Sequence, residues 1–282
     1  MTTILDGKNV ANQLTTKLQE KVKELNLKNI IPTLYVIEVG EDPASRIYLK
    51  AKENLAKRIG IKEVTLKFSE NISQKELIDK IIELNRDPKV NGIMVQLPLP
   101  KHIDTEKIVA TIAPEKDADG FHPYNQGRMW QSKTQIIPAT VRGILALLDY
   151  YQLDVSGKDA VIIGRSLIVG KPLASQFLRR DATVTIAHSK TKNLADLTNR
   201  ADIVVSDVGQ AHLLKRDMIK ENAVLIDVGM NRKNGHLMGD IDYQECFDKA
   251  SAITPVPGGV GPLTVVSLMQ QVLILAENQI NG

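Results

Sequence analysis

The chain has 282 residues, of which 43% are hydrophobic and 24% charged, and its formal net charge is +3. Lysines and acids are interspersed and aromatics make up only 4%, which argues against a nucleic-acid surface, while the single cysteine, Cys246, excludes an intramolecular disulfide and a cysteine metal cluster. There is no signal-peptide core and no apolar run expected to span a membrane, so we expect a cytoplasmic protein of two modest domains or one large one.

Two amphipathic helices flank a strand at the start of the chain. The first is indicated by one apolar face that contains Val10, Leu14, Leu18, Val22 and Leu25. Residues 33–39 favour a strand, and the second helix begins after a cap at Asp42 and ends at Gly60. Tyr48 and Lys52 lie one turn apart on this helix, at the edge of its core-facing stripe. Alone, the pair indicates only a surface lysine beside a half-buried tyrosine, since lysines are mostly exposed.

A polar residue interrupts the next buried strand. A strand near 64–68 and a helix opened by the capping-box spacing of residues 73–76 come first. The apolar segment 92–100 then ends in prolines, which stop the hydrogen-bond ladder and leave Gln96 near the carboxyl end of its strand, where open α/β sheets place ligands. The alternative is an amide that neighbouring backbone groups satisfy.

Residues 114–128 are rich in turn formers and polar groups, which is typical of a structured loop between domains. Asp117 and Asp119 are each either a functional carboxylate or only a turn former. His122 is either a functional histidine or an ordinary loop histidine. An amphipathic helix from Thr140 to about Tyr150 follows.

The segment 159–172 predicts a strand, a phosphate-binding turn and a helix. Gly164 can take backbone angles closed to other residues, Gly170 permits close approach of a ligand, and Pro172 suits the first turn of a helix. The N-terminus of such a helix favours an anion, although a strand entering a buried helix would look much the same. Three later apolar runs at intervals that fit β-α-β units favour a doubly wound parallel sheet: residues 183–187, 202–205 and 223–227.

The end of the second strand of this sheet predicts the cofactor. An acidic side chain there usually holds the ribose hydroxyls of NAD, but this strand ends in His188-Ser189-Lys190-Thr191-Lys192. These lysines and hydroxyls, together with Arg165, would attract a 2′-phosphate, which favours NADP over NAD. Each basic residue alone would be no more than a solvated loop charge, and only the three together indicate NADP.

Residues 254–264 contain three prolines and three glycines and precede a largely apolar helix over 265–276. The glycines would let the backbone approach a ligand closely, and the prolines would hold it there. The alternative is a rigid hinge to a helix that packs back on the first domain, and both can hold.

Several long motifs, in this order, resemble those of the bifunctional methylenetetrahydrofolate dehydrogenase/methenyltetrahydrofolate cyclohydrolase family. The matching segments are Asp42-Pro43-Ala44-Ser45 with Tyr48 and Lys52, and residues 92–100, 116–128, 164–172, 188–189, 227–231 and 255–264. The resemblance implies an α/β fold with an N-terminal α/β substrate domain (1–137, completed by the C-terminal helix 265–282), a doubly wound Rossmann-type NADP domain (138–264) and a cleft between them. It further implies that the chain oxidises 5,10-methylenetetrahydrofolate with NADP, hydrolyses the methenyl product to 10-formyltetrahydrofolate, and works as a homodimer without a metal.

Carried over by position, the resemblance also assigns site residues. Lys52 would be the catalytic lysine and Gln96 its partner. Tyr48 would line the aminobenzoate ring of the folate, and Asp119 would bind the pterin, so that these four form the implied catalytic set. Folate-side backbone would come from Pro257, Gly258 and Gly259. The cofactor would be lined by Gly164, Arg165, Ser166, Ser189 and Met230, with the arginine and Ser189 nearest its 2′-phosphate.

One departure from the family pattern concerns the cofactor. Asp207 stands where a small apolar residue is usual, at the end of a strand near the expected dinucleotide. Its carboxylate would repel a cofactor phosphate, bind a ribose hydroxyl or point away, and the sequence leaves all three open.

Two other classes compete with this interpretation. An NADP-dependent amino-acid or shikimate-type dehydrogenase shares the two-domain plan but does not explain Tyr48, Lys52, Gln96 and the 255–264 loop together. A non-enzymatic dinucleotide sensor would need only the second half of the chain.

Overall fold

The computed structural model describes residues 1–40, 43–233 and 236–281, and for residues 43–48, 233 and 281 it describes the backbone alone. By its internal contacts the chain divides into two units, one of residues 1–12 and 140–264 and the other of residues 13–139 and 265–282. Two long helices, α1 (Gly7–Leu27) and α10 (Val260–Asn281), contribute residues to both units.

The first unit is built on a six-stranded sheet in the order β1-β11-β8-β7-β5-β6, in which every neighbouring pair is parallel. Its strands are β1 (Thr3–Ile4), β5 (Asp159–Ile163), β6 (Thr183–Ala187), β7 (Ile203–Ser206), β8 (Val224–Asp227) and β11 (Ala252–Ile253). The strand order reverses between β5 and β7, as in doubly wound sheets. The predicted Rossmann-type sheet is therefore confirmed.

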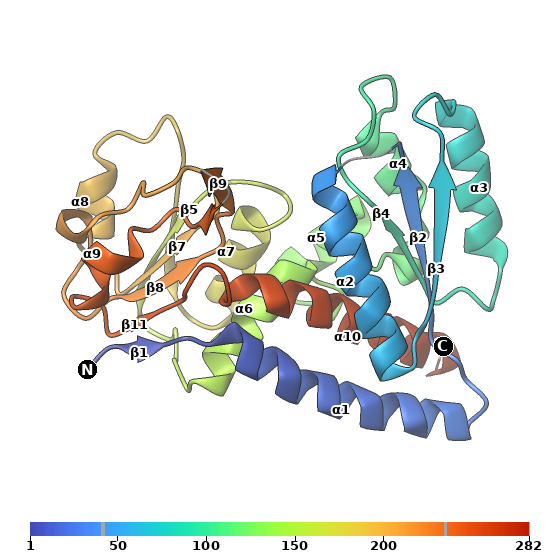
Figure 1. The fold of residues 1–282 in the computed structure, drawn as a ribbon, viewed down its shortest axis with the longest axis horizontal. Helices are drawn as coiled ribbons and strands as arrows, with labels where there is room; N and C mark the ends of the chain where they lie inside the picture. The colour runs from blue at the N-terminus through green and yellow to red at the C-terminus, as the bar shows by residue number, and fades with distance from the viewer. Residues whose placement is uncertain (41–42, 234–235, 282) are drawn as a thin grey trace. The chain divides into compact units, whose positions relative to one another are not determined.

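Helices cover both faces of this sheet, which is why its strands are almost continuously apolar. They are α6 (Ala139–Tyr150), α7 (Gly170–Arg179), α8 (Leu194–Thr198) and α9 (Tyr243–Phe247), with a short 3-10 helix at Arg216–Met218 and a hairpin of β9 (Asn231–Lys233) and β10 (His236–Met238). Helix α7 packs against β5 and β6 (Figure 1). A core that includes Val161, Val204 and Leu225 packs against apolar side chains of α8 and α9.

The second unit has a smaller parallel sheet in the order β3-β2-β4. Its elements are β2 (Thr33–Val39), α2 (Pro43–Ile59), β3 (Lys62–Phe68), α3 (Gln74–Arg86), β4 (Gly92–Val95), α4 (Thr105–Thr111), a 3-10 turn at Pro114–Lys116 and α5 (Pro123–Trp130). Helices α3 and α4 cover one face of the sheet, where Ile37, Ile81 and Ile108 are fully buried. Helix α3 begins with the predicted capping box, in which Ser73 and Glu76 bond to each other's backbone N–H groups. Because side chains alternate along a strand, β2 and β4 present different residues to α2 on the other face.

The start of the chain is placed differently from the predicted domain boundary. Residues 1–12 were expected in the N-terminal substrate domain, but they group with the Rossmann-type sheet. The cause is β1, which pairs with β11 through Thr3 with Ala252 and Ile4 with Ile253 and so forms an edge of that sheet.

One helix in the described part of the chain, over Val260–Ile280, is long and apolar enough to cross a membrane by length and composition, contrary to the prediction that no apolar run would span one. Two thirds of its most apolar window is buried within the protein. That is the pattern of a helix that packs in a protein core.

Candidate active site

The side chain of Lys52 points from α2 onto the sheet of the second unit. Its Nζ lies 3.0 Å from Gln96 Oε1 and 3.3 Å from Met94 Sδ. The amide nitrogen of Gln96 donates to the carbonyl of Leu97 at 2.8 Å, which leaves Oε1 directed at the lysine. The predicted proximity of Lys52 and Gln96 is thus present in the structure.

Burial is the main influence on the ionisation of this amine. It lowers the pKa of Lys52 from its usual value, and the negative charges of Asp119 and Glu63 oppose that shift. Asp119 is affected in the opposite sense, because burial raises the pKa of its carboxyl to about 7, while the charge of Lys52 lowers it. An amine and a carboxyl group whose pKa values are shifted toward neutrality are suited to proton exchange with a substrate.

Asp117 is the turn former of the two aspartates. Its carboxylate is 1% exposed and accepts four hydrogen bonds of 2.9–3.2 Å. The donors are the backbone N–H groups of Gly120, Phe121 and His122 and the side-chain amide of Asn125. These bonds fix the backbone just after Asp119, so Asp117 holds that residue in place near Lys52.

Two other polar residues of the same loop have structural roles. Lys116 is buried and its ammonium donates to the carbonyls of Leu84 and Asp87 at the end of α3. His122 caps α5, since its Nδ1 accepts the backbone N–H of Tyr124 at 3.0 Å. Of the two interpretations of His122, the structure therefore supports the ordinary loop histidine.

The remaining residues of the predicted folate site are not brought together with Lys52 within the second unit. The side chain of Tyr48 lies outside the described residues, although its backbone is part of α2. Pro257, Gly258 and Gly259 belong to the first unit, where the carbonyl of Gly258 accepts the backbone N–H of Lys8 at 3.2 Å.

The turn after β5 closes tightly on itself in the first unit. Gly164 has a φ of 130°, which other residues rarely adopt, and a Cβ there would lie 2.7 Å from the carbonyl oxygen of Asp207. A Cβ on Gly170 would overlap the carbonyl of Gly164. Both glycines are therefore required by the close packing of the predicted strand, turn and helix.

Ser166 occupies the hydrogen-bond donors at the start of α7. Its Oγ accepts the backbone N–H groups of Val169 at 3.0 Å and Gly170 at 3.3 Å, and it donates to Asp207 Oδ2 at 3.0 Å. The helix N-terminus that the sequence offers to an anion is thus already capped within the turn, so a phosphate must compete with Ser166 for these N–H groups.

The other predicted cofactor residues lie at the carboxyl edge of the same sheet. Arg165 follows β5, Ser189 follows β6 and Met230 follows β8. The side chain of Arg165 is exposed and forms no hydrogen bond or ion pair with another residue of the described ranges. Strands β5 and β6 are paired along their whole lengths, so the loops that carry Arg165 and Ser189 leave the sheet side by side.

Apolar side chains are exposed in the loops at this edge, namely Leu167, Ile168, Val208 and Met230. Each is at least 41% exposed. An apolar surface beside a glycine turn and an exposed guanidinium fits a ligand with flat rings and phosphates, because the rings would cover the apolar groups and the guanidinium would pair with a phosphate. The residues present therefore fit NADP.

Two buried carboxylates hold the loops after β7 and β8. Asp240, which is 0% exposed, accepts five hydrogen bonds of 2.8–3.3 Å. Their donors are Ser206 Oγ, the N–H groups of Val208, Gly209 and Gln210, and the side-chain amide of Asn231. Asp227 accepts the N–H groups of Gly229, Asp240 and Ile241. A Cβ on Gly229 would overlap the carboxylate of Asp240, so this position has room only for glycine.

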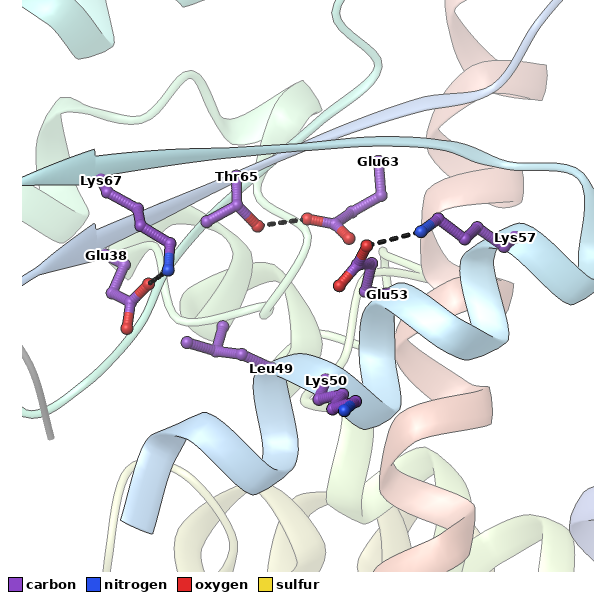
Figure 2. A pocket seen from close by; sticks show the side chains of 8 residues that line it. All are labelled: Glu38, Leu49, Lys50, Glu53, Lys57, Glu63, Thr65 and Lys67. Atoms are coloured by element: carbon purple, nitrogen blue, oxygen red, sulfur yellow. Dashed lines mark hydrogen bonds and ion pairs between the residues drawn. The ribbon is translucent and has the colours of Figure 1, made fainter. Parts of the chain in front are cut away.

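The second unit also has a cavity of about 570 Å³ between α2 and β3, shown in Figure 2. Charged side chains line it, and most of them pair with a neighbour on the same helix, the same strand or the adjacent strand. Lys57 bonds to Glu53 at 2.6 Å, Thr65 to Glu63 at 2.5 Å, and Lys67 lies 3.6 Å from Glu38. Since its charges are largely paired and none of the predicted site residues lines it, we do not assign the reaction to this cavity.

No cluster of three or more His, Cys, Asp or Glu side chains placed to hold a metal occurs within residues 1–40, 43–233 and 236–281.

The first unit has a doubly wound sheet with a glycine turn and a basic loop after its second strand, and the smaller sheet of the second unit carries a half-buried lysine–glutamine pair. Together these features define a two-domain dinucleotide-dependent α/β oxidoreductase. Residues 5–119 match the model of the tetrahydrofolate dehydrogenase/cyclohydrolase catalytic domain, and residues 138–280 match that of the tetrahydrofolate dehydrogenase/cyclohydrolase NAD(P)-binding domain. The chain belongs to the tetrahydrofolate dehydrogenase/cyclohydrolase family, as the sequence predicted.

Individual relatives agree with this assignment. The bifunctional protein FolD of Lactobacillus gasseri is 63% identical over 99% of both chains. The crystal structure of the bifunctional enzyme FolD from Campylobacter jejuni is 44% identical and superposes with a TM-score of 0.97 over 99% of both chains. The Trypanosoma brucei enzyme, solved with NADP cofactor and an inhibitor, is 35% identical with a TM-score of 0.94 and covers 100% of this chain and 99% of its own. The competing shikimate-type and sensor interpretations are thereby set aside.

Three contributors to these sites could not be identified from the sequence. Met94 contacts Lys52, but it lies in an apolar strand and gives no polar signal. Asp240 follows a short hairpin without a periodic pattern. The role of Asp117 had a signal, since a carboxylate three residues before a glycine is typical of a turn, but the pattern did not separate it from Asp119.

Proposed function

We propose that this chain oxidises 5,10-methylenetetrahydrofolate to the methenyl form with NADP and hydrolyses that product to 10-formyltetrahydrofolate. The observation that carries the proposal is the half-buried amine of Lys52, held 3.0 Å from Gln96 and influenced by Asp119, in a chain of the tetrahydrofolate dehydrogenase/cyclohydrolase family. Tyr48, Lys52, Gln96 and Asp119 are the proposed catalytic and folate-binding set, with backbone from residues 257–259.

In the hydrolytic step the neutral amine of Lys52 accepts a proton from water as the water oxygen bonds to the bridging carbon of the methenyl group. The amine returns that proton to N5 of the folate as the carbon–N5 bond breaks, and the remaining hydroxyl proton leaves to solvent as the formyl group forms. Burial favours the neutral amine, and Gln96 orients it. Asp119 binds the pterin in this scheme.

In the oxidative step NADP, when bound, supplies the hydride acceptor. The residues of this chain orient the two flat ring systems and need no proton relay for that transfer. Gly164, Arg165, Ser166, Ser189 and Met230 are proposed to line the cofactor, with Arg165 and Ser189 nearest the 2′-phosphate.

The function is tested by assaying the purified protein in two separate reactions. Methylenetetrahydrofolate with NADP should yield NADPH, and methenyltetrahydrofolate without NADP should be hydrolysed faster than in buffer alone. A protein that gave NADPH but no accelerated hydrolysis would contradict the bifunctional proposal, and one that gave neither product would contradict it entirely.

The preference for NADP predicts a selective effect of Arg165→Ala. The guanidinium pairs with the 2′-phosphate in our proposal, and NAD lacks that group, so the variant should bind NADP more weakly by about 1 to 3 kcal/mol and NAD almost unchanged. Dissociation constants from calorimetry for both cofactors measure the difference. Arg179→Ala, which removes an exposed arginine from the last turn of α7, is the matched control. Equal losses for the two cofactors would contradict the assignment of Arg165.

We also propose that the chain forms a homodimer through its Rossmann-type unit. Strand β6 is an edge of the six-stranded sheet, and on the neighbouring α7 the side chain of Leu178 is 49% exposed. An open strand edge beside an exposed apolar residue is suited to pairing with a second copy. Sedimentation at micromolar concentration should give a dimer, and Leu178→Glu should shift the equilibrium toward monomer. A wild-type monomer under these conditions would refute the proposal.

Tetrahydrofolate derivatives are the proposed small-molecule partners. We further propose a cytoplasmic enzyme that needs neither a membrane nor a nucleic acid, on the grounds of its mixed surface charge and the burial of its most apolar helix.

A further inference from the structure

The carboxylate of Asp207 contacts the dinucleotide turn directly. Its Oδ2 accepts the hydrogen bond of Ser166 Oγ at 3.0 Å, and its backbone N–H donates to Ile163 at the end of β5. Its backbone carbonyl lies against Gly164, where a Cβ would come within 2.7 Å. The sequence left three possibilities open for this side chain, and the structure excludes one of them: the carboxylate does not point away from the turn.

This contact consumes the hydrogen-bonding capacity of Ser166. A serine hydroxyl has one proton to donate and two lone pairs to accept. In the structure the proton goes to Asp207, and the oxygen accepts the N–H groups of Val169 and Gly170. A phosphate that approaches this turn therefore finds the hydroxyl proton held by an anion and the first N–H groups of α7 already bonded.

We propose that Asp207 sets the affinity of this site for its cofactor: it weakens the binding of dinucleotide phosphates at the turn by holding the Ser166 hydroxyl and by its own negative charge. This inference rests on the proposed use of NADP. Protonation of Asp207 removes the charge and frees the serine proton to turn toward a phosphate, so dinucleotide affinity rises as the pH falls.

The surroundings of Asp207 place the protonation of its carboxyl in an accessible pH range. Burial raises the pKa of its carboxyl to about 6, the hydrogen bond from Ser166 lowers it, and the charge of Asp240 raises it. The basic groups in the same turn and in the first turn of α7 are Arg165 and Lys171, both exposed. Since the protonated form binds the anion better, the affinity gain is present below about pH 6 and is lost above it.

The test compares the wild type with Asp207→Ala and Asp207→Asn by calorimetric titration with NADP and with NAD. At pH values well above the pKa of Asp207, the alanine variant should bind both cofactors about tenfold more tightly, which is the scale of one lost unfavourable charge contact. The asparagine variant keeps an acceptor for Ser166 but loses the charge, so its gain should be smaller. Asp196→Asn, which changes an exposed carboxylate of the same unit, should alter neither affinity.

NAD is the probe for the pH profile, because it lacks the 2′-phosphate, which itself titrates near neutral pH. Wild-type affinity for NAD should increase as the pH is lowered through the pKa of Asp207, and this increase should be absent in both Asp207 variants. Unchanged affinity in the alanine variant would overturn the inference, and weaker binding would show instead that the carboxylate holds a ribose hydroxyl. If the wild type bound no NADP, the proposed function would fail before the inference was reached. Thermal unfolding of each variant confirms that it is folded.

Discussion

Lys52→Met should slow the hydrolysis of added methenyltetrahydrofolate by roughly a hundredfold or more, because it removes the group that exchanges a proton with water. Methionine keeps most of the length of the lysine side chain and suits the contact with Met94, so folate binding should be largely retained. Hydride transfer to NADP should suffer less, since it depends on the alignment of two rings.

The two steps are measured separately on the same purified variant, with methylene substrate and NADP in one assay and methenyl substrate alone in the other. Lys50→Met is the matched control, because Lys50 is an exposed lysine of the same helix that makes no contact with Gln96. Hydrolysis at the wild-type rate in Lys52→Met would return Lys52 to the interpretation of a surface lysine and would remove the basis of the proposed site.

The pairing of Lys52 with Gln96 illustrates what the sequence predicts well. Helical spacing places Lys52 at the edge of a core-facing stripe, and two prolines end the strand just after Gln96, so each residue could be located on its own element. That they lie 3.0 Å apart depends on how α2 packs against the sheet, which no local pattern encodes. The proposed link between them came from the family resemblance.

The Rossmann-type sheet was predictable for a different reason. Each of β5 to β8 is a short β-branched run at regular intervals, and parallel strands need crossovers of that length. Strands β1 and β11, by contrast, have two residues each and join distant parts of the chain. Such short strands leave no periodic pattern, so the strand pairing that groups residues 1–12 with the Rossmann-type sheet was not predicted from the sequence.

The capping of α7 was hidden from sequence for a physical reason. A helix start after a glycine turn predicts open N–H groups and hence an anion site. Whether a nearby hydroxyl has already taken those groups depends on one rotamer of Ser166, and that rotamer is stabilised by Asp207 from a loop 41 residues away. A departure from the family pattern at position 207 was visible in the sequence, but its partner was not.

Asp240→Ala should cost about 3 to 5 kcal/mol of unfolding free energy, the scale expected when a fully buried, hydrogen-bonded carboxylate is removed and its donors are left unpaired. Asp240 is 0% exposed, and the donors left without an acceptor would include Ser206 Oγ and the N–H groups of Val208 and Gln210. Water that enters the vacated space would satisfy some of them, which is why the expected cost is less than the sum over all five bonds.

Asp240→Ala should also weaken cofactor binding, because the carboxylate of Asp240 connects the loop after β7 to Asn231 after β8. With that tie removed, the loops that carry Asp207 and Met230 lose their fixed positions, and dinucleotide affinity should fall at temperatures where the variant is still folded.

Urea unfolding and calorimetric titration with NADP measure the two effects. Asp240→Asn, which retains one acceptor oxygen, should lie between the wild type and the alanine variant in both, and Asp217→Ala, at an exposed aspartate of the same unit, should match the wild type. A fully stable Asp240→Ala protein would show that the five hydrogen bonds contribute little, and one that lost stability but bound NADP normally would separate this network from the cofactor site.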